Sequence, residues 1–84
     1  MPRARKRIRH QSTLRIGNVV VAGHRTSVRL EPVMWDALHE IAAEQGKNLN
    51  QLVTQIQRSA GGSSLTSAIR VYIVEFYRAA ARSR

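Results

Sequence analysis

The sequence predicts a small, mainly α-helical domain in which one β-strand pairs across a homodimer and precedes two helices and a third, C-terminal helix. Residues 24–30 alternate between apolar and polar side chains, as a half-buried strand does. Two helical periodicities follow on either side of Gly46, and a third begins after Gly61 and Gly62. The chain has 84 residues and no cysteine. A core this small usually needs an additional stabilising element, so we expect a partner subunit.

The predicted strand has one apolar and one cationic face. Thr26, Val28 and Leu30 would face the core, and Arg25, Ser27 and Arg29 would face outward. No second strand of matching quality follows, so the strand is expected to pair with itself in a second copy, antiparallel and centred near Ser27. That pairing brings Arg25 close to Arg29 of the second copy, where like charges destabilise a ladder. A surface strand kept for structure would avoid this arrangement, whereas a ribbon in the major groove gains from it.

The residues before this strand allow two interpretations. Residues 14–16 and 19–21 are β-prone triplets around Gly17-Asn18, so they can form a tight hairpin. Alternatively, residues 19–22 form a lone extended segment that leads into the main strand, with Gly23 as the bend. The second interpretation is slightly favoured.

The three helices have clear start and stop signals. Glu31-Pro32 fits the start of the first helix, and Gly46 fits its end. Asn48 and Gln51 resemble a capping box for the second helix, and a third helix is expected over about residues 64–82. Apolar residues recur at helical spacing on the first two helices. Together with the apolar strand face they predict a dimer core of Thr26, Val28, Leu30, Trp35, Leu38, Ile41, Leu52, Val53 and Ile56.

The charge distribution favours nucleic acid as a partner. Lys and Arg number 14 against 5 acidic residues, which gives a net charge of +9. Residues 1–30 contain only basic charges, whereas residues 31–45 contain only acidic ones. Residues 1–13 are expected to be a disordered basic arm whose Arg5, Lys6 and Arg7 contact phosphates, and residues 14–84 to be the domain. The alternative for the arm is a solvated charge run. No apolar run is long enough for a membrane helix, so no membrane partner is expected.

No pattern in the chain indicates catalysis. The glycine pair lacks the lysine of a phosphate-binding loop, and the five acidic residues form no acid/base pair. The three histidines lack metal-ligand spacing. We therefore expect no enzyme activity, no metal and no cofactor.

The order of these elements resembles the ribbon-helix-helix DNA-binding proteins. The stretches 23–31 (GHRTSVRLE) and 65–70 (LTSAIR) look like a subgroup of short bacterial members known mainly from alphaproteobacteria. The resemblance covers about residues 23–78 and implies that two chains intertwine and place paired strands in the major groove. It assigns base contacts to Arg25, Ser27 and Arg29, and a phosphate contact to the backbone amides of Asn48, Leu49 and Asn50. Lys47 beside that helix start and His24 beside the ribbon are further candidate phosphate contacts.

The predicted function is sequence-specific binding of double-stranded DNA by a homodimeric bacterial transcriptional repressor, located in the cytoplasm on the nucleoid. The main alternative is an antitoxin or a conjugation accessory protein whose acidic first helix or C-terminal helix binds another protein. A chromosome-compacting protein without sequence preference and a basic peptide at a membrane surface are further alternatives. The interrupted second helix and the twenty or so residues before the strand depart from the plain family pattern.

Overall fold

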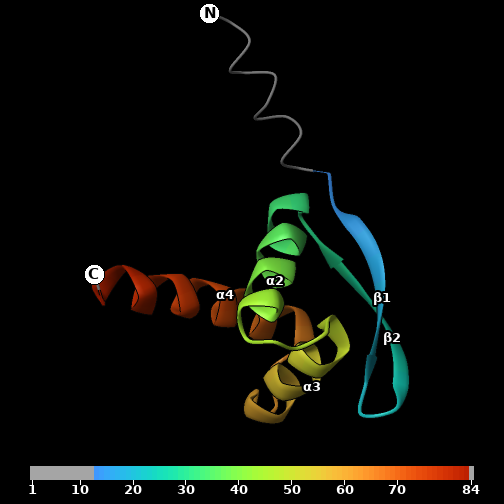
Figure 1. The fold of residues 1–84 in the computed structure, drawn as a ribbon. Helices are drawn as coiled ribbons and strands as arrows, with labels where there is room; N and C mark the ends of the chain where they lie inside the picture. The colour runs from blue at the N-terminus through green and yellow to red at the C-terminus, as the bar shows by residue number, and fades with distance from the viewer. Residues whose placement is uncertain (1–12, 84) are drawn as a thin grey trace, which may run out of the picture.

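The computed structural model describes residues 13–83, and its elements follow the predicted order. They are β1 (Arg15–Val21), β2 (His24–Leu30), α2 (Pro32–Glu44), α3 (Leu49–Ser59) and α4 (Leu65–Arg82). The two strands form a hairpin that lies along one side of the helices, and the C-terminal half of α4 extends away from it (Figure 1). The predicted fold class, a β-ribbon followed by three helices, is confirmed. Of the predicted arm, only Thr13 lies within the described residues.

The strand at residues 24–30 finds its partner within the same chain. β1 and β2 are antiparallel, with Val21 opposite His24 and Arg15 opposite Leu30. The expectation that the chain offers this strand no partner of its own is therefore wrong, whereas its pairing with a second copy stays a prediction. The bend at Gly23 is confirmed, but the segment before it is a full strand of the hairpin. Gly17-Asn18, the alternative turn, lies inside β1.

Burial explains why the chain turns at Ala22-Gly23. Both residues have positive φ, 51° and 85°, as a type I′ two-residue turn requires. A left-handed conformation costs about 1 to 2 kcal/mol at an alanine. The resulting register places Val19 and Val21 on the same sheet face as Val28, and all three are buried. Burying each such side chain is worth about 1.5 to 3 kcal/mol, so the three together outweigh the strain.

The helix boundaries follow the signals in the sequence. Pro32 is the first residue of α2, and Gly46 has a φ of 69° just beyond its end. There the Gly46 and Lys47 N–H groups donate to the carbonyls of Ala43 and Ala42, the two bonds of a Schellman motif. Asn48 and Gln51 form the complete capping box of α3. The Ser64 hydroxyl accepts from the Ser67 N–H at the start of α4.

A single chain completes its own hydrophobic core. Eight of the nine predicted dimer-core residues are buried within this chain, and the ninth, Thr26, is half-buried. The hairpin and α4 also contribute side chains to this core. The buried residues include Val19 and Val21 of β1 and Ile69 and Ile73 of α4. These side chains are thus already removed from water within one chain, and their contact with a second copy stays a prediction.

Two hydrogen bonds connect α4 to α2 and to Gln45, the residue that follows α2, beside this core. The Tyr77 hydroxyl donates to the Glu40 carboxylate (2.9 Å), and the Gln45 amide donates to the Tyr72 hydroxyl (2.9 Å). Burial raises the pKa of the Tyr77 hydroxyl above its ordinary value, and the carboxylates of Glu40 and Glu44 raise it further. None of the helices within residues 13–83 is long and apolar enough to cross a membrane.

Candidate nucleic-acid interface

The hairpin has one face on the core and one face open to solvent. The three side chains predicted to contact bases, Arg25, Ser27 and Arg29, are all exposed on the open face. Side chains of a strand alternate between its two faces. With Val28 and Leu30 buried on one face of β2, Arg25 and Arg29 therefore point outward from the other. Within residues 13–83, neither arginine forms an ion pair. Their guanidinium donors are therefore available to a ligand.

The turn end of the hairpin is fixed to α3. The Val20 N–H donates to the Asn50 side-chain oxygen (2.8 Å), and the Ala22 N–H donates to the Thr54 hydroxyl (3.3 Å). Both N–H groups belong to the edge of the hairpin that β2 does not cover, where an unpaired backbone group would otherwise be left to solvent. These bonds place the start of α3 beside the turn.

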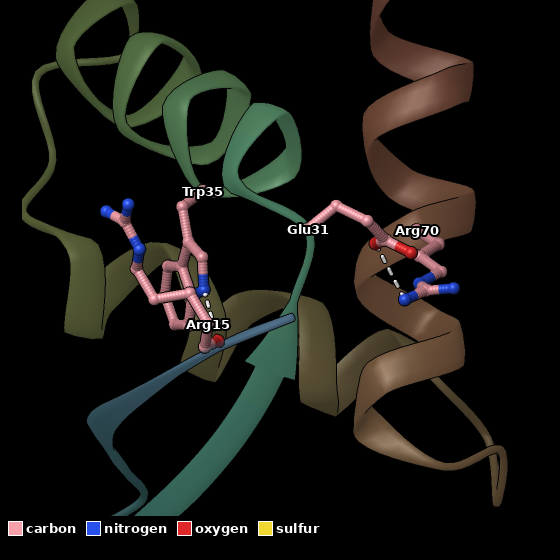
Figure 2. Close-up of polar contacts among 4 residues, drawn as sticks. All are labelled: Arg15, Glu31, Trp35 and Arg70. Carbon is pink, nitrogen blue, oxygen red and sulfur yellow. Dashed lines mark hydrogen bonds and ion pairs between the residues drawn. The ribbon is translucent and has the colours of Figure 1, made fainter. Parts of the chain in front are cut away.

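The open end of the hairpin is fixed to α2 and α4 (Figure 2). The Trp35 indole N–H donates to the Arg15 carbonyl (2.9 Å), while its ring lies against Gly17. A Cβ at Gly17 would lie 2.7 Å from the ring, so only glycine permits this contact. On the other strand, the Arg70 guanidinium binds the carboxylate of Glu31 (2.8 Å), the residue after β2. The helices thus hold the hairpin at both ends and leave its outer face free.

The start of α3 offers two free backbone N–H groups next to this hairpin. The Gln51 N–H is already bound by the Asn48 side chain, and the Asn48 N–H is bound by the Gln51 side chain (both 2.8 Å). The amides of Leu49 and Asn50 have no such partner among the described residues. Unpaired amides and the partial positive charge of a helix N-terminus favour an anion. Of the three predicted phosphate-contacting amides, only those of Leu49 and Asn50 are open in this structure.

The remaining predicted phosphate contacts differ in their surroundings. Lys47 is half-buried, and its ammonium group donates to the Gln55 side chain. His24 is exposed at the turn end of β2. Arg5, Lys6 and Arg7 lie outside the described residues.

Sequence reasoning missed the contribution of β1 to the open face. Ile16, Asn18 and Val20 stand opposite Arg29, Ser27 and Arg25, respectively, and all three are exposed. A signal for this hairpin was present in the sequence. Two segments of equal length, residues 15–21 and 24–30, lie on either side of the two residues Ala22-Gly23. Alanine is unusual in a type I′ turn, so the pattern did not identify the hairpin.

The described residues offer no metal centre. No group of three or more histidine and acidic side chains within residues 13–83 is placed to hold a metal ion.

Known proteins resemble both the sequence and the fold. Residues 14–77 match the family described as ribbon-helix-helix domain. A solved structure with a similar fold is that of an uncharacterized protein from Bordetella pertussis Tohama I, with a TM-score of 0.73 and 29% identity. The similarity covers 89% of this chain and 64% of that one, so this chain spans less than two thirds of that relative's length. No curated protein matches this chain.

Proposed function

Because the chain belongs to the ribbon-helix-helix domain family, we propose that it binds duplex DNA sequence-specifically and acts as a bacterial transcriptional repressor. This family consists of DNA-binding regulators that generally act as dimers. The proposal places the two-stranded hairpin in the major groove, which admits a β-ribbon of this width. A repressor of this kind acts on the chromosome, so its place would be the cytoplasm.

The observation that carries the proposal is a rigidly held ribbon with an uncovered cationic face. Arg25 and Arg29 lie on that face, and Trp35, Arg70 and Asn50 fix the hairpin from behind. Preorganisation lowers the entropy lost on binding, and arginine matches the major-groove edge of guanine with two hydrogen bonds. Ribbon and helix start lie side by side. In this proposal, the Leu49 and Asn50 amides contact the phosphate backbone while the ribbon contacts bases.

Selection of bound fragments from a random duplex pool at physiological salt tests this function. We expect one enriched motif, repeated or inverted if two copies bind together. Competition by non-specific duplex should barely reduce binding to the enriched fragments. A pool that binds without enrichment would contradict sequence-specific recognition and would support the alternative of a chromosome-compacting protein.

We also propose that the protein acts as a homodimer, joined through the outer face of α4. Because β1 already pairs with β2 within the chain, we place the second copy on another surface. On α4, Val71 and Val74 are 55% and 48% exposed, one helical turn apart, and the same face carries Glu75 and Arg78. In an antiparallel pair of α4 helices whose two-fold axis lies midway between Glu75 and Arg78, each Glu75 would lie beside Arg78 of the other copy. The exposed apolar and oppositely charged groups are thus complementary to themselves, as a two-fold interface requires.

Replacing Val74 with glutamate should dissociate this dimer. The substitution would place one negative charge from each copy in the apolar part of the interface. Sedimentation equilibrium of the full chain measures the effect, and we expect at least a tenfold increase in the dimer dissociation constant, about 1.4 kcal/mol. Val33→Glu is the matched control, since Val33 is 66% exposed on α2, outside this face. A wild-type chain that stays monomeric would contradict the homodimer, and a dimer unaffected by V74E would place its interface elsewhere. Capture of a different protein by α4 would support the antitoxin alternative.

A further inference from the structure

Both strands of the hairpin contribute to its open face. β1 places Ile16, Asn18 and Val20 there, opposite the three β2 residues expected to contact bases. The ribbon of one chain is therefore complete, and half of its outward side chains come from a strand with no assigned role. These side chains differ in kind from those of β2: they are two aliphatic groups and one amide, with no charge.

Asn18 occupies the centre of this face, where one hydrogen bond orients its side chain. The Ser27 hydroxyl on the opposite strand donates to the Asn18 side-chain oxygen (3.0 Å). That bond uses one lone pair of the oxygen and leaves its second lone pair and both N–H donors free. A free acceptor and a free donor on one planar amide match the major-groove edge of adenine, where N6–H₂ donates and N7 accepts.

The two aliphatic neighbours suit the same kind of base pair. Ile16 is 56% exposed and Val20 is 40% exposed, whereas the alternate residues Val19 and Val21 are buried. A single exposed aliphatic residue needs no explanation. Here, however, two of them flank Asn18 on the face proposed to enter the groove. The C5-methyl group of thymine is the apolar contact that the major groove offers, and it accompanies every adenine.

We propose that Asn18 is a specificity-determining residue that recognises an adenine near the centre of the half-site, with Ser27 as its positioning residue. This rests on the proposed DNA-binding function. β1 then contacts A·T pairs through Asn18, Ile16 and Val20, while β2 contacts guanines through its two arginines. The assignment changes the role of Ser27 from a base contact to a group that orients another side chain.

Selection from a random duplex pool, repeated with variants, tests this assignment. For the wild type we expect a conserved A·T pair between the guanine positions. Asn18→Ala should remove the preference at that pair alone and weaken binding to the wild-type motif by about tenfold or more. Asn18→Thr keeps strand propensity and should lose the same preference. Gln57→Ala, an exposed amide on α3, is the matched control and should select the wild-type motif.

The positioning role of Ser27 has its own readout. Ser27→Ala should relax discrimination at the adenine position while leaving the guanine positions intact, whereas a purely structural role would weaken binding to all sequences equally. If the wild type selects a motif and both Asn18 variants select the same motif with equal affinity, this inference is wrong although the proposed function stands. If the wild type selects no motif, the proposed function itself fails.

Discussion

Replacing Trp35 with alanine will lower the free energy of unfolding by about 3 to 5 kcal/mol, the usual range for truncation of a large buried aromatic side chain. The Trp35 side chain is buried against Gly17, and its N–H satisfies the Arg15 carbonyl. A domain of this size has only about 5 to 15 kcal/mol of stability in total. Urea denaturation followed by circular dichroism measures the loss, since Trp35 is the chain's one tryptophan.

Two further variants separate the parts of this contact. Trp35→Phe keeps an aromatic ring but leaves the Arg15 carbonyl without its donor, so it should cost about 1 kcal/mol from the hydrogen bond, plus the lost ring volume. Gly17→Ala should destabilise the wild type, because the new methyl group would overlap the indole. In the Trp35→Ala background that obstacle is gone, so the same change should cost little. Strictly additive effects would show that the ring does not rest on Gly17.

The helices could be predicted from the sequence because their signals are local. Pro32 marks the start of the first helix and Gly46 its end. The capping box of Asn48 and Gln51 marks the start of the second. Each signal depends on backbone groups within a few residues, so no knowledge of the tertiary fold was needed. The exposure of Arg25 and Arg29 also followed from strand alternation alone.

The hairpin could not be predicted because its stability is not local. Its turn contains Ala22, which is a poor turn residue, and β1 contains Gly17 and Asn18, which are poor strand residues. Only contacts in the folded protein explain why these residues occupy the turn and the strand. Gly17 makes room for Trp35, and the turn brings Val19 and Val21 over the core. Asn18 in turn lies on the face that we propose for base recognition, so local strand propensity was the wrong guide there.

The two arginines on the open face of the hairpin are expected to contribute strongly to DNA binding. Replacing both Arg25 and Arg29 with alanine should weaken binding to the selected motif by about 2 to 6 kcal/mol, because each bidentate arginine–guanine contact contributes roughly 1 to 3 kcal/mol of discrimination. The fold should be unaffected, since both side chains are exposed and unpaired within residues 13–83. Fluorescence anisotropy titration on motif and scrambled duplexes, at several salt concentrations, measures the loss.

A charge-conserving pair of substitutions decides how the two arginines act. Arg25→Lys with Arg29→Lys keeps both positive charges but removes the rigid pair of donors that fits guanine. If the arginines contact bases, the lysine variant should retain binding to scrambled DNA and its salt dependence while losing most of the preference for the motif. If they contact phosphates instead, lysine should restore nearly all of the affinity. The alanine variant should then weaken binding to every sequence alike and reduce the salt slope by about 0.9 per contact. Only the first outcome is compatible with a ribbon that recognises sequence, because a phosphate contact carries no information about the base beside it.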